Sequence, residues 1–190
     1  YLNGGPGAPA FLYVAPRHHC GFRQPLSGWF GHRDPFEFTP QYDAAGDIGQ
    51  YLCGTPPVLS MVALDAALDV WEGVNMTALR AKSQALTGYF IELVETRCAG
   101  HGLTLISPRD PDSRGSQISF THAEGGYAII SALIAEGVIG DFRAPDILRF
   151  GFTPLYTSFA DVWHAVDRMA AIMNERRWDK PEFHARKAVT

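Results

Sequence analysis

Residues 116–152, SQISFTHAEGGYAIISALIAEGVIGDFRAPDILRFGF, decide the fold of the C-terminal half of this chain. The stretch begins with a strand-like segment (SQISFTH), continues with an apolar helical segment (GGYAIISALIAEG) that ends at a glycine, and closes with two short strand-like runs (VIGDFR and ILRFGF). This order, preceded by the further strand-like segment LTLIS, predicts a small α+β unit with helices on one side of a sheet.

A helix is expected on each flank of this stretch. Downstream, the segment SFAD resembles a capping box and predicts a helix start at Ser158, with an apolar face formed by Val162, Val166, Met169 and Met173. Upstream, NMTALRAKSQALTGYFIELVETRCAG predicts one long amphipathic helix that ends near Gly100, with a stripe of Leu79, Leu86, Phe90, Leu93 and Val94.

The first part of the chain differs in composition and in its apolar pattern. Residues 1–57 are rich in Gly and Pro, and the apolar run FLYVA at residues 11–15 predicts one buried strand between loops. The segment VLSMVALDAALDVWEGV is apolar on almost every side, which predicts a buried helix with Pro57 at its first turn and Gly73 at its end. Such a helix is expected to lie at an interface.

Composition limits the class of protein. The 190 residues are 46% hydrophobic and 19% charged, which is typical of a packed globular protein, and the net charge of −4 with scattered basic residues argues against nucleic-acid binding. The three cysteines are far apart, which favours a reducing compartment, and we expect a cytoplasmic protein. No apolar stretch is long enough to span a bilayer, so we expect no membrane partner.

Several short motifs could carry chemistry. The segment NGGPG fits a tight turn better than a phosphate cradle, because it matches neither common phosphate-binding pattern. His18, His19 and Cys20 are adjacent but lack a second pair of ligands, so no metal site is predicted. Trp29 in GWFGHR either presents its indole N–H to an anion or packs as a core residue, and Thr55 before two prolines is by default a helix N-cap.

Arg149 is the most informative single residue. It is a basic residue inside the otherwise apolar run ILRFGF. A guanidinium in such a place requires a carboxylate, because a buried charge without a partner is costly and its fork matches a carboxylate bidentately. The partner is either an acidic residue of the protein, which is the commoner case, or the carboxylate of a ligand.

These segments together resemble the kynureninase family. The segments YLNGGPG, GWFGH, ALRAKSQALTGYF, SRGSQISF and PLYTSFADV stand in that family's order and approximate spacing over nearly the whole chain. The resemblance implies an α/β fold of the fold-type I pyridoxal-phosphate (PLP) superfamily. It also implies that the Schiff-base lysine lies immediately before Tyr1, so this chain would be the C-terminal part of a longer enzyme. Residues 1–74 would complete the large PLP-binding domain, residues 75–100 would form a connecting helix, and residues 101–190 the small C-terminal domain.

The resemblance also implies an activity and its residues. The activity is hydrolysis of L-kynurenine or 3-hydroxykynurenine to the anthranilate product and L-alanine, within tryptophan degradation or NAD biosynthesis. Trp29 and Thr55 match cofactor-binding positions, partly across a homodimer interface, and Arg149 matches the arginine that binds the substrate α-carboxylate. His32 is expected to be structural. No catalytic residue is assigned within these 190 residues, because the lysine is expected before Tyr1.

Two alternatives remain open. One is another fold-type I enzyme, such as a cysteine desulfurase-like lyase, which requires a reactive cysteine in a loop. The electropositive setting that would mark such a thiolate is not evident around Cys20, Cys53 or Cys98. The other alternative is a non-catalytic module for dimerisation or binding.

Overall fold

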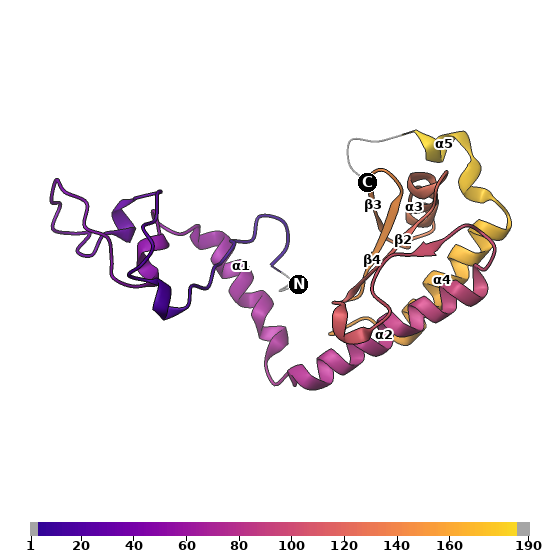
Figure 1. The fold of residues 1–190 in the computed structure, drawn as a ribbon, viewed down its shortest axis with the longest axis horizontal. Helices are drawn as coiled ribbons and strands as arrows, with labels where there is room; N and C mark the ends of the chain where they lie inside the picture. The colour runs from indigo at the N-terminus through magenta and orange to yellow at the C-terminus, as the bar shows by residue number, and fades with distance from the viewer. Residues whose placement is uncertain (1–3, 186–190) are drawn as a thin grey trace. The chain divides into compact units, whose positions relative to one another are not determined.

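The computed structural model describes residues 4–185 (Figure 1). The chain forms two compact units, an N-terminal unit that ends at Gly73 and a C-terminal unit that begins at Val74. Residues 1–3, with which the segment YLNGGPG begins, lie outside the described residues. The position before Tyr1, where a lysine is expected, lies outside them as well.

The C-terminal unit contains a four-stranded antiparallel sheet. Its strands are β1 (Thr104–Leu105), β2 (Gln117–Thr121), β3 (Asp141–Arg143) and β4 (Ile147–Gly151), in the spatial order β1-β2-β4-β3. All four were predicted from the sequence pattern. Strand β3 is shorter than the predicted segment at residues 138–143, because the backbone N–H of Val138 closes the preceding helix by donating to the carbonyl of Leu133 at 2.9 Å.

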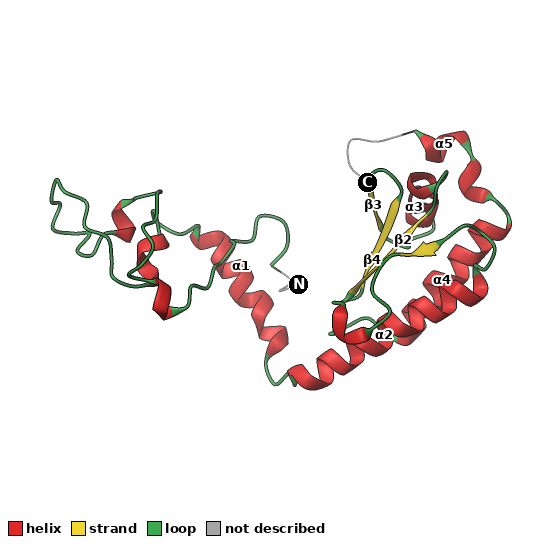
Figure 2. Cartoon of the chain, in the orientation of Figure 1, coloured by secondary structure: helices red, strands yellow, loops and turns green. Residues whose placement is uncertain are grey.

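Helices supply the rest of this unit's core. They are α2 (Met76–Arg97), α3 (Gly126–Ala135), α4 (Phe159–Asn174) and the short α5 (Pro181–His184). Helices α2 and α4 run alongside each other (Figure 2), while α3 contacts β3 and β4. The fully buried side chains come from the helices and from β2 and β4, and include Phe90, Phe120, Leu148 and Met169. The predicted small α+β unit is confirmed.

Helix α4 begins as its sequence predicts. The hydroxyl of Ser158 accepts a hydrogen bond from the backbone N–H of Asp161 at 3.1 Å, and the Asp161 carboxylate accepts one from the backbone N–H of Ser158 at 2.8 Å. The bond from the backbone N–H of Ser158, followed by one from its hydroxyl at 2.8 Å, holds the pKa of the Asp161 carboxyl below its usual value. All four residues of the predicted apolar face are buried: Val162, Val166, Met169 and Met173.

Two arginines fasten the loop between β1 and β2 to α2. Arg80, on α2, donates to the backbone carbonyls of Pro111 and Arg114, and Arg114 donates to the hydroxyl of Thr87 and to two loop carbonyls. Burial, followed by the nearby charge of Arg80, lowers the pKa of Arg114. The loop contains a short 3-10 turn, η5 (Pro111–Ser113), and leads into β2.

The N-terminal unit is built from loops, short 3-10 turns and one helix. The turns are η1 (Pro16–His18), η2 (Trp29–Gly31), η3 (Ile48–Tyr51) and η4 (Asp69–Trp71), and the helix is α1 (Val58–Leu68). The predicted buried strand at residues 11–15 is not formed among residues 4–185: the segment has no strand partner there, and Phe11 and Tyr13 are about four-fifths exposed. A strand needs a neighbour to pair its backbone groups, and the described residues offer none here.

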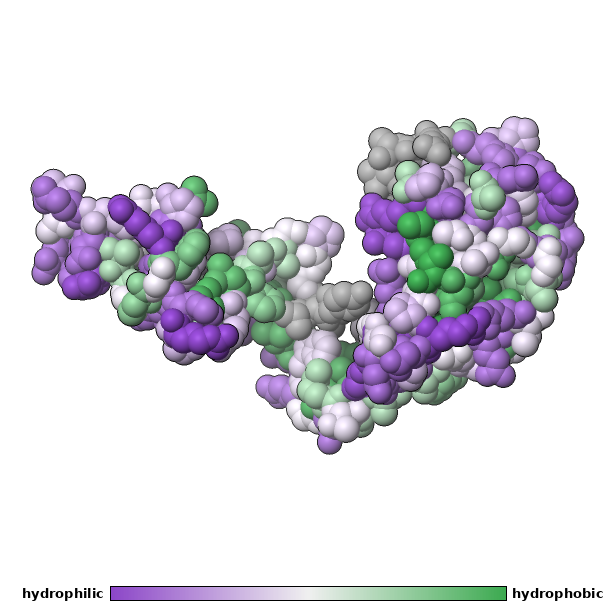
Figure 3. Space-filling model, in the orientation of Figure 1, coloured by the Kyte–Doolittle hydropathy of each residue, from purple (hydrophilic) through white to green (hydrophobic). Residues whose placement is uncertain are grey.

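The prediction of a buried α1 is also wrong for the described residues. Pro57 lies at the N-cap position and Gly73 has the expected positive φ of 71°, but none of the helix's residues is buried. Leu59 is 88% exposed, and Val58 and Val62 are each 61% exposed. Hydrophobic residues accordingly reach the surface of this unit (Figure 3). Within residues 4–185, no helix is both long and apolar enough to cross a membrane.

Candidate functional site

Two loops of the N-terminal unit meet at Gly28. A β-carbon placed on Gly28 would lie 1.8 Å from the carbonyl oxygen of Cys53, far inside any normal contact. The Cys53 thiol donates to the carbonyl of Leu26 at 3.1 Å, which holds the same loops together. Trp29 directly follows Gly28, and Thr55 lies two residues after Cys53. The contact between Gly28 and Cys53 therefore brings the segments of Trp29 and Thr55 together.

Trp29 lies on the surface of its loop. Its side chain is 48% exposed, and its ring meets the rings of Phe30 and Phe36 edge to face at centroid distances of 4.5 and 5.9 Å. Among residues 4–185, Trp29 is therefore not a core residue. The indole N–H is a donor without an acceptor role, which suits an anionic group.

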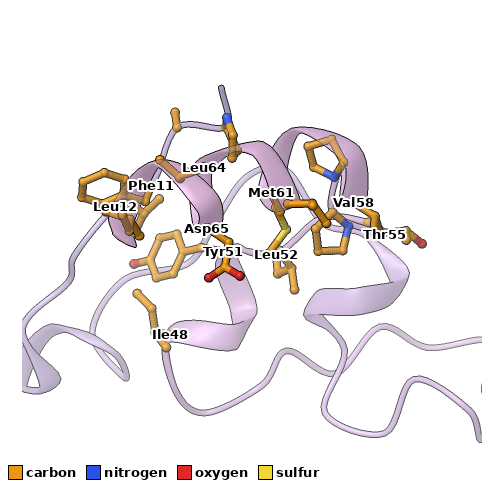
Figure 4. Close-up of a pocket in the computed structure, with 17 residues that line it drawn as sticks. Phe11, Leu12, Ile48, Tyr51, Leu52, Thr55, Val58, Met61, Leu64 and Asp65 are labelled. Carbon is orange, nitrogen blue, oxygen red and sulfur yellow. The ribbon is translucent and has the colours of Figure 1, made fainter. Parts of the chain in front are cut away.

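Thr55 is not the N-cap of α1. The N-cap position is held by Pro57, which has no hydroxyl and makes no side-chain capping bond. Thr55 instead lies at one end of an apolar groove with a volume of about 1220 Å³ (Figure 4). Phe11, Leu52 and Met61 are among the residues that line this groove. Thr55 is itself exposed, so its hydroxyl belongs to the surface of the unit.

The other polar residues of this unit have local structural roles. The ring of His32 accepts a hydrogen bond at Nδ1 from the backbone N–H of Asp34 at 2.9 Å, which agrees with the structural role expected for it. The Nε2 atom of His19 lies 2.8 Å from the carbonyl of Val14. Residues 5–8 form a turn in which Gly5 and Gly7 have positive φ. No group of three or more His, Cys, Asp or Glu within residues 4–185 could hold a metal ion.

Arg149 lies in the middle of β4 in the C-terminal unit. Its neighbours Leu148 and Phe150 are buried in the core, and Arg149 projects from the opposite face because successive strand residues alternate. Its side chain is 29% exposed, so the guanidinium is only partly removed from water. The partner that the structure shows is a carboxylate of the protein, the commoner of the two alternatives, whereas the resemblance favoured a ligand: Nη2 of Arg149 donates to Oδ2 of Asp141 at 2.6 Å.

Asp141 is the residue that the sequence reasoning missed. Strands β3 and β4 pair so that Asp141 lies directly opposite Arg149. The signal was present in the sequence, because a tight hairpin between the predicted strands VIGDFR and ILRFGF places these two residues in register. The ion pair provides one carboxylate from the protein. The role of Arg149 toward a substrate, like the cofactor contacts of Trp29 and Thr55, stays a prediction.

The Gly28 contact predicts a strong local effect. We expect Gly28→Ala to destabilise the N-terminal unit by about 1–3 kcal/mol, because the added methyl group would force the backbone at Cys53 to move. Limited proteolysis at residues 20–55 would measure this as faster cleavage. Gly21→Ala is the matched control, since a β-carbon there meets nothing within 4 Å. Equal cleavage rates in the two variants would contradict the prediction.

The cysteine desulfurase-like alternative requires a reactive thiol, so the surroundings of the three cysteines are relevant to it. Cys98 is buried, and burial raises the pKa of its thiol to about 11. Such a thiol is protonated at neutral pH and is a poor nucleophile. Cys20 and Cys53 are exposed, and their thiols lie within hydrogen-bonding distance of the backbone carbonyls of Gly46 and Leu26.

The chain is similar to a family of domains and to curated proteins of full length. Residues 79–169 match the family described as "Kynureninase C-terminal domain". All 190 residues align at 54% identity with kynureninase from Burkholderia mallei and from Burkholderia pseudomallei, and at 52% identity with kynureninase from Pseudomonas fluorescens. In each case the alignment covers the whole chain and 45% of the relative, so the chain spans just under half the length of these proteins.

Solved structures with a similar fold are enzymes of lower sequence identity. A cysteine desulfurase from Thermococcus onnurineus matches with a TM-score of 0.68 at 15% identity, over 86% of this chain and 42% of that one. A C-DES mutant with glycine covalently linked to its PLP cofactor matches with a TM-score of 0.61 at 17% identity, over 83% of this chain and 40% of that one. These likenesses confirm the predicted fold class and say nothing of activity. On its sequence identity along the entire chain, this polypeptide belongs to the kynureninase family and corresponds to the C-terminal part of its members.

Proposed function

We propose that this chain contributes to the hydrolysis of L-kynurenine or 3-hydroxykynurenine to the corresponding anthranilate and L-alanine. The observation that carries the proposal is the 54% identity to kynureninases over all 190 residues. The chain spans 45% of the length of those relatives. In this proposal it therefore acts together with the remaining part of such a protein, which would include the lysine that holds the cofactor. Three cysteines outside any disulfide suit the reducing cytoplasm, where tryptophan degradation would employ the enzyme.

The cofactor of the proposed reaction is pyridoxal phosphate. When bound, it supplies the electron sink for cleavage of the bond between Cβ and Cγ. The exposed residues of the N-terminal unit fit its phosphate group: Trp29 offers an indole N–H, Thr55 offers a hydroxyl, and the close contact at Gly28 brings their segments together. In this proposal both side chains donate hydrogen bonds to the phosphate end.

Arg149, in the C-terminal unit, is proposed to bind the substrate. Its guanidinium is suited to the α-carboxylate of an amino acid, because its planar fork binds carboxylates bidentately. A carboxylate fixed in this way orients the side chain of the substrate and so the bond that breaks. The position of Arg149 on the helix-free face of the sheet, with 29% of its side chain exposed, supports access by a small molecule.

We also propose that the N-terminal unit is covered in the working enzyme, by the remaining residues of the complete polypeptide and by a second copy. The support is the apolar surface of this unit, which includes the groove beside Thr55 and the exposed side chains of α1. Contiguous apolar surface of this kind is typical of interfaces. In a homodimer, Trp29 and Thr55 would serve the partner's cofactor.

Trp29→Phe tests the cofactor contact. We expect the dissociation constant of pyridoxal phosphate to rise about 10-fold, because a hydrogen bond to a charged phosphate is lost while the aromatic ring is kept. Equilibrium dialysis followed by cofactor absorbance measures it. Trp163→Phe is the matched control, since Trp163 on α4 is 40% exposed. Undiminished cofactor retention in Trp29→Phe would remove this assignment.

The proposed activity itself is tested with the complete polypeptide. Incubated with pyridoxal phosphate and L-kynurenine, it should release anthranilate and alanine in equal amounts. The ratio of the rates with L-kynurenine and 3-hydroxykynurenine gives its preference. Release of alanine and sulfide from L-cysteine, without anthranilate from kynurenine, would favour a desulfurase instead. A protein with the mass of these 190 residues and no cofactor absorbance would favour a non-catalytic module.

A further inference from the structure

We propose that Asp141 is a positioning residue, which holds the guanidinium of Arg149 in the orientation that receives the substrate carboxylate. The inference rests on the proposed function, and it assigns to Asp141 a role in substrate binding beyond structural support. Three observations carry it: the strand register, the partial exposure of the ion pair, and the charge of its surroundings.

The strand register places the two side chains together. Asp141 on β3 and Arg149 on β4 are directly opposite residues of an antiparallel pair, so their side chains project from the same face of the sheet. The 2.6 Å hydrogen bond joins Oδ2 of Asp141 to Nη2 of Arg149. A guanidinium has five N–H donors, so a bond through Nη2 is compatible with a second carboxylate on the same group.

The exposure of the pair is suited to a ligand. The side chains of Arg149 and Asp141 are 29% and 41% exposed, so the pair lies at the surface of the helix-free face. An ion pair at this depth contributes little to stability, because water screens it and two side chains lose rotamer freedom. Its clearer effect is on geometry, since a long arginine side chain held by a fixed carboxylate samples fewer orientations.

The surrounding charge keeps the site attractive to an anion. Oδ2 of Asp141 also lies 3.2 Å from Nη2 of Arg143, at the other end of β3. Two guanidinium groups share one carboxylate, so the cluster of Asp141, Arg143 and Arg149 has a net charge of +1. Asp141 can therefore orient Arg149 without cancelling the positive charge that a substrate carboxylate meets.

The test is a comparison of kinetic constants in the complete holoenzyme. We expect Asp141→Ala to raise KM for L-kynurenine about 10-fold with a much smaller change in kcat, because a charge-assisted hydrogen bond that orients Arg149 is lost. Asp141→Asn keeps the shape and an acceptor oxygen, and it should fall between Asp141→Ala and the wild type. Asp167→Asn is the matched control: Asp167 forms an ion pair with Arg97, between α2 and α4, with side chains 46% and 32% exposed.

A double-mutant cycle separates positioning from a general structural effect. If Asp141 acts through Arg149, then Asp141→Ala should change KM little when Arg149 is already alanine. A lowered KM in Asp141→Ala would show that Asp141 competes with the substrate, and an unchanged KM would show that it does not position Arg149. Either result overturns this inference alone, whereas a wild-type holoenzyme that forms no anthranilate overturns the proposed function with it.

Discussion

Replacing Arg149 by lysine in the complete polypeptide is expected to raise KM for L-kynurenine by about 10- to 100-fold. Lysine keeps the positive charge but loses the planar fork, so it cannot bind a carboxylate bidentately or keep the same bond to Asp141. The absorbance of bound pyridoxal phosphate should stay nearly unchanged, because the proposed phosphate contacts are Trp29 and Thr55. Steady-state kinetics and an absorbance spectrum of the same preparation measure both effects.

Arg109→Lys is the control for this substitution. Arg109 is also in the C-terminal unit, its side chain is 68% exposed, and it forms an ion pair with Glu95. The control makes the same chemical change at a position with no proposed contact to the substrate or to Asp141, so KM should change by less than about 3-fold. If Arg149→Lys changes KM no more than the control does, Arg149 does not bind the carboxylate.

Phe90→Ala is expected to cost about 3–5 kcal/mol of the free energy of unfolding of the C-terminal unit. Phe90 on α2 is 1% exposed, and its ring centroid lies 5.0–6.1 Å from those of Phe120, Phe150 and Phe152. Its removal would leave a cavity between the helix and the sheet. Because the strand that carries Arg149 lines this cavity, substrate binding should weaken as well.

Urea unfolding followed by circular dichroism measures this loss. Phe159→Ala is the control, since Phe159 at the start of α4 is 46% exposed and, within residues 4–185, its ring meets only that of Tyr89. It should cost about 1 kcal/mol or less. If Phe90→Ala unfolds at the same urea concentration as Phe159→Ala, the result would contradict the packing described for this core.

The C-terminal unit could be predicted because its signals are local. The capping box at Ser158 is read from four residues, and the alternation around Arg149 is read from one strand. Three buried positions of α2 lie outside the predicted stripe, and one of them is the apolar Ile91. The other two, Ser83 and Thr87, were missed because they are polar. Their burial depends on partners far along the chain: the hydroxyl of Ser83 lies 2.7 Å from that of Ser116, and Thr87 accepts a hydrogen bond from Arg114.

The N-terminal unit could not be predicted in the same way. The apolar runs at residues 11–15 and in α1 indicate side chains that favour burial, but such a pattern does not say what covers them. Among the described residues nothing covers Leu59, and no strand pairs with Phe11. The predicted strand and helix therefore need partners outside residues 4–185, and the sequence pattern does not identify those partners.

The candidate site was predicted in part. Electrostatics alone required a carboxylate for Arg149, and the structure supplies Asp141. The identity of that residue depends on the register between β3 and β4, which periodicity does not give. The meeting of the Trp29 and Thr55 segments depends on the contact of Gly28 with Cys53. The 24 positions between these two residues carry no sign of this contact in the sequence.

The claim that Arg149 receives the α-carboxylate is tested most directly by a ligand that lacks this group. The inhibition or dissociation constants of L-kynurenine and of its decarboxylated amine should be compared in the wild-type holoenzyme and in Arg149→Ala. We predict that the wild type prefers the amino acid by about 10-fold or more, and that the variant loses this preference because it binds L-kynurenine more weakly. The same preference in both proteins would contradict the account.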